Sequence, residues 1–145
     1  MNQPIRILIA DNDLNFVKGL QYALAQQADL QVVDIVRDGQ GVVNSCREWL
    51  PDVVLLDLHL PVLDSVKTIQ RLMAQNEDLR ILTMSALAND RYALEAVKAG
   101  ACGYIEKASP FELMANTIRQ VAGGDVCVNP ALAASILEEF HRLGV

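Results

Sequence analysis

The chain has 145 residues, of which 52% are hydrophobic, and a formal net charge of -6 at pH 7. This length and apolar content suit one domain with one substantial core and leave no room for a second full domain. The negative charge opposes binding to a phosphate backbone, so we do not expect this segment to grip DNA. No apolar run approaches the ~18 residues of a membrane helix and no signal-peptide pattern opens the chain, so we expect a cytoplasmic protein that does not enter the membrane.

Cysteine and histidine offer little for disulfide or metal chemistry. Cys46, Cys102 and Cys127 form no C-x-x-C pair and lie among apolar neighbours, which favours buried free thiols in a reducing compartment. The two histidines, His59 and His141, are too few for a transition-metal cluster of the usual spacing.

Short runs rich in Ile, Val and Leu alternate with helical patterns along the chain. This alternation predicts an α/β fold, a doubly wound parallel sheet with helices on both faces. If the polar ends of the first and third strands are neighbours, the strand order is 2-1-3-4-5. The five expected strands are Ile5 to Ala10, Gln31 to Val36, Val53 to Asp57, Arg80 to Met84 and Gly103 to Glu106.

Helices are expected between these strands and after the last one. The first has an apolar face that should pack on the sheet. Ser109 is a candidate cap for the fifth, with Pro110 in its first turn, and Asn129 and Pro130 open an extra C-terminal helix that runs to the end of the chain. The first apolar face comprises Phe16, Val17, Leu20, Ala23 and Leu24, the last comprises Leu132, Ile136, Phe140 and Leu143, and the other helices are expected at residues 38–49, 64–75, 89–99 and 110–122.

Polar residues recur where the expected strands end. In an open parallel sheet the working residues collect at the carboxyl ends of the strands. Carboxylates, a hydroxyl and an ammonium should therefore meet at one edge, a set suited to a divalent cation and a phosphoryl group. The residues concerned are Asp11, Asn12, Asp13, Asp57, Ser85, Tyr104 and Lys107.

Each of these residues also has a purely structural explanation. Asp11 and Asp13 could cap the first helix, but capping needs one carboxylate and leaves Asp57 unexplained. A carboxylate that ends a buried apolar strand is costly unless it is paired or bound to a metal, which favours a functional role for Asp57. Taken singly, Lys107 is a solvated charge and Tyr104 a packing aromatic, and only their position relative to the other strand ends marks them.

The motifs at these positions resemble the receiver domains of two-component response regulators. They are ILIADND, PDVVLLDLHLP followed by Asp64, ILTMSA and AGACGYIEK, within residues 4–125. The resemblance implies a flavodoxin-like fold and a signalling switch, not an enzyme, in which a sensor histidine kinase phosphorylates Asp57. It further implies the roles of seven other residues: Ser85 and Lys107 contact the phosphoryl group, Tyr104 is the aromatic switch, and Mg2+ is held by Asp11, Asn12, Asp57 and the backbone carbonyl of His59, with Asp13 as a further candidate ligand.

Elementary chemistry agrees with these implied roles. A carboxylate is a weak nucleophile toward an anionic phosphoryl donor, so a divalent cation and a lysine are needed to neutralise the charge that accumulates. The new acyl phosphate adds negative charge and acceptor oxygens. Ser85 and Lys107 can then move inward, and Tyr104 can turn into the space that Ser85 leaves. The side chain of His59 is expected to face solvent as a bystander.

The chain departs from the family pattern at three positions. Asn12 stands where the family has a second acidic residue, which removes one charge from the metal site and should weaken Mg2+ binding. Asp13 could replace that ligand, directly or through water. Ser65 stands where a glycine is usual and Ala108 where many members have proline, so the loop geometry there can differ.

The C-terminal part resembles the NarL/FixJ subgroup, in which the receiver precedes a LuxR-type helix-turn-helix domain. The AGACGYIEK run, the double glycine at 123–124 and the Asn-Pro-Ala sequence carry this resemblance. We therefore divide the chain into a receiver domain, residues 1–125, and a linker helix, residues 126–145, that leads toward a DNA-binding domain outside this sequence. A piece of a longer transcriptional regulator is expected, a natural single-domain regulator is the alternative, and homodimer formation stays open.

Three other functions match parts of the sequence. A haloacid-dehalogenase-like phosphohydrolase would use Asp11 as nucleophile and Asp13 as acid and base, but it needs a further acidic motif after Lys107 and a flap after the first strand. A flavodoxin-like FMN carrier needs a glycine-rich or hydroxyl-rich phosphate loop where this chain has acidic residues. An atypical receiver that binds proteins without being phosphorylated is supported by Asn12 alone.

Overall fold

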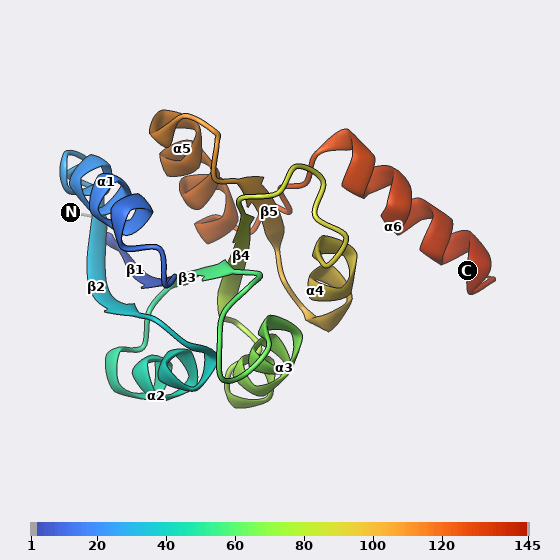
Figure 1. The fold of residues 1–145 in the computed structure, drawn as a ribbon, viewed down its shortest axis with the longest axis horizontal. Coiled ribbons are helices and arrows are strands. Elements are labelled where there is room, and N and C mark those ends of the chain that lie inside the picture. The colour runs from blue at the N-terminus through green and yellow to red at the C-terminus, as the bar shows by residue number, and fades with distance from the viewer. Residues whose placement is uncertain (1–2, 145) are drawn as a thin grey trace.

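A parallel sheet forms the centre of the protein in the computed structural model, which describes residues 3–144 (Figure 1). Its order is β2-β1-β3-β4-β5, so the predicted order is confirmed and β1 lies beside β3. Two strands differ from the expected bounds by one residue, because β2 begins one residue earlier and β4 continues to Ser85. The strands are β1 (Ile5–Ala10), β2 (Leu30–Val36), β3 (Val53–Asp57), β4 (Arg80–Ser85) and β5 (Gly103–Glu106).

Helices cover both faces of this sheet, as the predicted doubly wound, flavodoxin-like fold requires. Figure 1 shows α1 and α5 on one face and α2, α3 and α4 on the other. The extra C-terminal helix is also present as α6, which projects beyond α4. The helices are α1 (Leu14–Ala25), α2 (Gly39–Trp49), α3 (Ser65–Gln75), α4 (Ala93–Ala99), α5 (Phe111–Ala122) and α6 (Pro130–Arg142).

The central strand β3 explains why an uninterrupted apolar run ends in a single carboxylate. Val54 and Leu56 pack into the cluster under α2, α3 and α4, while Val53 and Leu55 pack into the cluster under α1 and α5. A strand buried on both faces needs apolar residues at every position. Each fully buried side chain of this kind contributes roughly 1.5–3 kcal/mol. The packing therefore holds the end of the strand, and Asp57 with it, in a fixed place.

The fourth helix begins later than predicted and the fifth has a different cap, whereas α2, α3 and α5 begin within one residue of the predicted bounds. Ser109 does not cap α5: its N–H donates to the Glu106 carbonyl in a turn, and Pro110 occupies the cap position without a side-chain bond. The fourth helix begins at Ala93 and not at residue 89, because the Asp90 carboxylate accepts the Tyr92 N–H and holds residues 89–92 in a turn. The cap at Asn129 is as expected, since its side chain accepts the Leu132 N–H.

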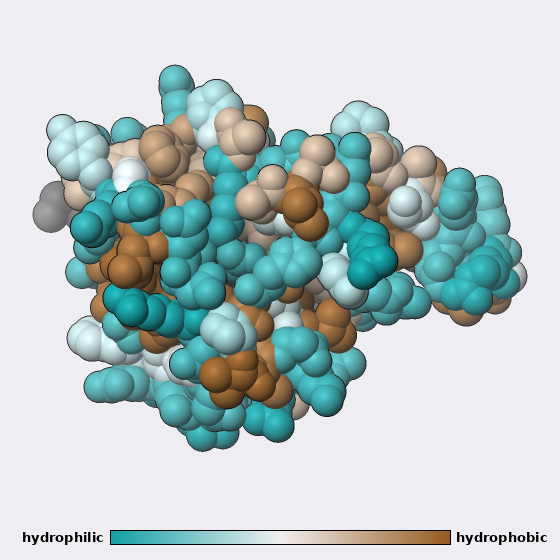
Figure 2. Space-filling view, in the orientation of Figure 1, coloured by the Kyte–Doolittle hydropathy of each residue, from teal (hydrophilic) through white to brown (hydrophobic). Residues whose placement is uncertain are grey.

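The last helix packs on α4 along only part of its apolar face. Leu132 is buried and Ile136 packs against the same core, but Phe140 is 51% exposed and Leu143 is 63% exposed. A pair between Lys98 Nζ and Glu139 Oε1 at 3.2 Å adds a polar contact between the two helices. Figure 2 shows a largely hydrophilic surface with separate apolar patches. In residues 3–144 no helix has the length and apolar character needed to cross a membrane.

Candidate functional site

The acidic side chains of the site lie at the carboxyl ends of two neighbouring strands. Asp57 is the last residue of β3, and Asp11 follows β1 directly. The β1 and β3 strands pair up to Ala10 and Leu56, which brings the two carboxylates to the same edge of the sheet. Asp11 is completely buried and Asp57 is 6% exposed. Charged groups this deeply buried need partners, and each has several.

Backbone and hydroxyl groups orient both aspartates. The Asp13 N–H donates to Asp11 Oδ1 at 2.9 Å, and the His59 N–H donates to Asp57 Oδ1 at 2.8 Å. The Ser65 hydroxyl donates to the Asp57 backbone carbonyl at 2.7 Å. Ser65, which stands where the family usually has glycine, thus ties the start of α3 to the end of β3.

A single ammonium joins the two carboxylates. Lys107, just after β5, places its Nζ 2.5 Å from Asp11 Oδ2 and 2.6 Å from Asp57 Oδ2. Burial opposes the charge of this lysine, but hydrogen bonds with both aspartates raise its pKa above the usual value. Burial raises the pKa of the Asp11 carboxyl, against the lowering effect of Lys107. The Lys107 Nζ also lies 4.9 Å from the centroid of the Phe16 ring.

The oxygen donors at this edge fit a hard divalent cation. Among residues 3–144, Asp11 Oδ2 is buried and accepts no hydrogen bond from a neutral donor, and its close partner is the Lys107 ammonium at 2.5 Å. No three His, Cys, Asp or Glu side chains of the described chain gather into a metal-binding group. Mg2+ is commonly held by one or two carboxylates and keeps several waters, so Asp11 and Asp57 satisfy that requirement.

Asn12 and Asp13, the other candidate ligands, are exposed. The Asp13 carboxylate accepts the Phe16 N–H at 3.3 Å and so caps α1. This is the structural role that capping preferences give to an aspartate at this position. An amide at residue 12 leaves two acidic side chains, Asp11 and Asp57, at the sheet edge.

The candidate switch residues Ser85 and Tyr104 are buried and are joined through the loop after β4. Ser85 Oγ donates to Asp90 Oδ2 at 2.6 Å and accepts the Leu87 N–H at 3.0 Å. The Tyr104 hydroxyl donates to the Leu87 carbonyl at 2.9 Å and accepts the Asp90 N–H at 3.2 Å. Both side chains therefore bond to the same short loop, residues 86–90, and their hydrogen bonds within residues 3–144 do not include Asp57.

Asp90 is the residue of this site that sequence reasoning missed. Its side chain is 1% exposed and accepts bonds from Ser85, from the Tyr92 N–H and from His59. The His59 Nε2 lies 2.5 Å from Asp90 Oδ2, so the expectation that this imidazole is a bystander in solvent is wrong, although 43% of the side chain is exposed. The sequence carried no signal for this contact, because position 90 falls inside the predicted fourth helix.

Known proteins agree with this geometry. The family model described as the response regulator receiver domain matches residues 7–119. The chain is 27% identical over 139 residues to the transcriptional regulatory protein DegU of Brevibacillus brevis, covering 96% of this chain and 59% of that protein. It is 29% identical over 138 residues to the response regulator GacA of Pseudomonas aeruginosa, covering 94% of this chain and 64% of that protein. The crystal structure of a LuxR-family two-component response regulator from Aurantimonas sp. SI85-9A1 has a TM-score of 0.84 at 26% identity, covering 94% of this chain and 98% of that one.

This chain belongs to the response regulator receiver family. The sequence resemblance, including its NarL/FixJ and LuxR-type character, is confirmed, and the dehalogenase-like and flavodoxin-like alternatives are excluded by the family match over residues 7–119. The first of these relatives is named as a transcriptional regulatory protein and the second as a response regulator. The chain spans about 59% to 64% of the length of these two relatives.

Proposed function

We propose that Asp57 accepts a phosphoryl group from a sensor histidine kinase and thereby switches a transcriptional output. The observation that carries this proposal is the Lys107 ammonium, held 2.5 Å from Asp11 and 2.6 Å from Asp57 in a nearly buried position. A surface ion pair would not need this burial. A positive charge fixed beside a carboxylate nucleophile meets the main demand of phosphoryl transfer, which is neutralisation of accumulating negative charge.

The transfer forms one phosphorus–oxygen bond and breaks one phosphorus–nitrogen bond. A carboxylate oxygen of Asp57 attacks the phosphorus, and the imidazole of the donor histidine leaves with the electrons of the broken bond. Lys107 then exchanges part of its contact with the carboxylates for a phosphoryl oxygen. Asp11, Asp57, the His59 carbonyl and either Asn12 or Asp13 would hold Mg2+, which when bound would supply positive charge beyond that of a single lysine. Ser85 and Tyr104 respond to the new group as the switch pair.

The wider role of the protein is part of the same proposal. Residues 1–125 act as the receiver, and residues 126–145 lead toward a C-terminal domain that binds DNA, as the names of the longer transcriptional regulators suggest. A cytoplasmic location follows, since a regulator of transcription acts where the DNA is. The net charge of -6 supports the assignment of DNA binding to another segment. The receiver can act as a monomer or a homodimer in this scheme.

The test is phosphorylation by a small donor. The protein is incubated with acetyl phosphate and Mg2+ and its intact mass is measured. We expect one added phosphoryl group that is labile in alkali, and none in Asp57→Asn. Asp125→Asn, an exposed carboxylate outside the site, is the matched control and should be labelled like the wild type. Label retained in Asp57→Asn would refute the assignment, and no label in the wild type would favour a receiver that works only by binding proteins.

A further inference from the structure

The hydroxyl of Ser85 has its single proton committed to a buried carboxylate. A serine hydroxyl donates one hydrogen bond. In this protein that bond goes to Asp90 Oδ2 at 2.6 Å, a short distance typical of a charge-assisted bond. The Leu87 N–H fills the acceptor side of the same oxygen at 3.0 Å. Ser85 cannot donate to a phosphoryl group on Asp57 while it keeps this bond.

The Asp90 carboxylate is held in place from three directions. Besides Ser85, it accepts the Tyr92 N–H on Oδ1 at 2.9 Å and contacts His59 Nε2 through Oδ2 at 2.5 Å. Burial alone would raise the pKa of the Asp90 carboxyl, but the bonds from Ser85, Tyr92 and His59 lower it below the usual value. The carboxylate is therefore ionised at neutral pH and is a strong acceptor.

His59 connects this carboxylate to the phosphoacceptor loop. Its backbone N–H donates to Asp57 Oδ1 at 2.8 Å, while its ring reaches Asp90. The ring also packs edge-on against Tyr92, with centroids 5.5 Å apart. The loop after β3 and the loop after β4 are thus linked by one side chain, and that link passes through the carboxylate that holds Ser85.

We propose that Asp90 and His59 are positioning residues that restrain phosphorylation of Asp57 by withholding the Ser85 hydroxyl. This inference rests on the proposed function. Ser85 Oγ can speed phosphorylation by donating to a phosphoryl oxygen only after it leaves Asp90 Oδ2, and His59 opposes this exchange by keeping Asp90 in place. We call Ser85, Asp90 and His59 the hydroxyl clamp.

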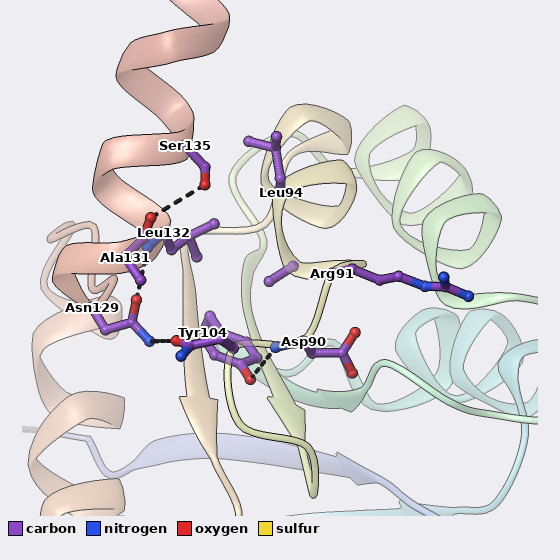
Figure 3. Close-up of a pocket in the computed structure, with 10 residues that line it drawn as sticks. Asp90, Arg91, Leu94, Tyr104, Asn129, Ala131, Leu132 and Ser135 are labelled. Atoms are coloured by element: carbon purple, nitrogen blue, oxygen red, sulfur yellow. Dashed lines mark hydrogen bonds between the residues drawn. The ribbon is translucent and has the colours of Figure 1, made fainter.

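Release of the hydroxyl clamp would change contacts at the start of α6. Figure 3 shows the Asp90 backbone nitrogen directed at the Tyr104 hydroxyl, while the Asp90 carboxylate points away from the pocket between this loop and α6. Asn129, the cap of α6, approaches Asn89 through an amide contact of 3.4 Å. A shift of Asp90 therefore alters the contacts of Tyr104 and of the residue that begins the last helix.

The test measures the rate of labelling by acetyl phosphate with Mg2+ in Asp90→Ala, Asp90→Asn and His59→Ala. We expect Asp90→Ala to accelerate labelling about tenfold, because a charge-assisted bond no longer has to be broken. Asp90→Asn keeps the size of the side chain but makes it a weaker hydrogen-bond acceptor, so its labelling rate should lie between those of the wild type and Asp90→Ala. Glu95→Ala, which removes an exposed carboxylate of α4 from the hollow beside His59, is the control and should match the wild type.

A double-mutant cycle shows whether the effect passes through Ser85. In a Ser85→Ala background the clamp has no hydroxyl to withhold, so Asp90→Asn should then leave the labelling rate unchanged. Amide hydrogen exchange at Leu87 and Tyr92, whose N–H groups bond to Ser85 and Asp90, reports the clamp without phosphorylation and should quicken in His59→Ala.

The outcomes separate this inference from the proposed function. Wild type and Asp90→Asn labelled at equal rates would leave the proposed function standing and overturn the clamp. Acceleration that persists without Ser85 would also overturn it. A wild type that labels poorly while Asp90→Asn labels well would support both. No label in any form would reject the proposed function, and the restraint on phosphorylation with it.

Discussion

Replacement of Lys107 by methionine tests the charge balance of the site. Methionine has a similar length but no charge, so it leaves the Asp11 and Asp57 carboxylates, now 2.5 and 2.6 Å from the ammonium, without their shared cation. Removal of one partner from a buried ion pair costs about 3–5 kcal/mol. Asp11 can relieve part of this cost by binding a proton, because burial already raises its pKa. We therefore expect a loss near the lower end, about 3 kcal/mol of unfolding free energy at pH 7.

The pH dependence of this loss has a definite sign. A carboxyl whose pKa is raised in the folded state contributes stability below its unfolded pKa, near 3.8, and loses that contribution as pH rises through its folded pKa. Without Lys107 the pKa of Asp11 rises further, since the lysine lowers it in the wild type. The loss of unfolding free energy in Lys107→Met should therefore become smaller as pH falls from 7 toward 4.

Urea denaturation of both forms, with and without millimolar Mg2+, measures these effects. Mg2+ should reduce the difference in unfolding free energy between the wild type and Lys107→Met, since it would supply the missing positive charge. Lys98→Met is the control, because Lys98 is 42% exposed and its pairs with Glu95 and Glu139 lie at the surface, where such contacts contribute about 0–1 kcal/mol. A loss for Lys107→Met below about 1 kcal/mol, or a gap that does not vary with pH, would refute the reasoning.

Three further outcomes follow from the structure. Asn12→Asp adds a unit charge beside the proposed Mg2+ site and should tighten Mg2+ binding about ten- to thirtyfold in a titration, and equal affinities would show that another side chain already supplies this charge. Burial raises the pKa of the Cys46 thiol to about 12, so iodoacetamide should label the half-buried Cys102 and Cys127 first and reach Cys46 only in denaturant, as peptide mass mapping can show. Gly39→Ala places a methyl carbon too close to the Leu63 carbonyl oxygen and should cost about 1–3 kcal/mol in thermal unfolding, whereas an unchanged midpoint would mean that α2 shifts freely.

The sheet could be predicted because its residues obey short-range rules. The apolar run at residues 53–56 has no polar interruption, and only a strand buried on both faces needs such a run. The meeting of Asp11, Asp57 and Lys107 followed from the parallel arrangement, since the carboxyl ends of all strands in a parallel sheet lie at the same edge. Local pattern alone was enough for both.

The loop after β4 could not be predicted in this way. Its conformation depends on Asp90, whose partners Ser85 and His59 belong to two different strand ends and are brought together only by the packed fold. Helical periodicity extended the fourth helix to residue 89 because the sequence does not reveal that a side chain takes the Tyr92 N–H. The error at Ser109 has a similar origin, because the preceding turn uses its N–H and leaves Pro110 at the cap.

The position of α6 means that a small rotation at its start gives a larger displacement at its C-terminal end. Its base is held by a backbone β-bridge between Cys127 and Gly103 of β5 and by the contact of Asn129 with Asn89, while Ile136 and Glu139 pack it on α4. Thirteen residues extend from that base, a length of about 20 Å at 1.5 Å per residue. A rotation of about 10° at the base would displace the far end by roughly 3 Å, several times the movement of the residues that cause it. Any domain joined to the end of α6 would be moved by that larger displacement. The exposed side chains of Phe140 and Leu143, near the same end, would move with it.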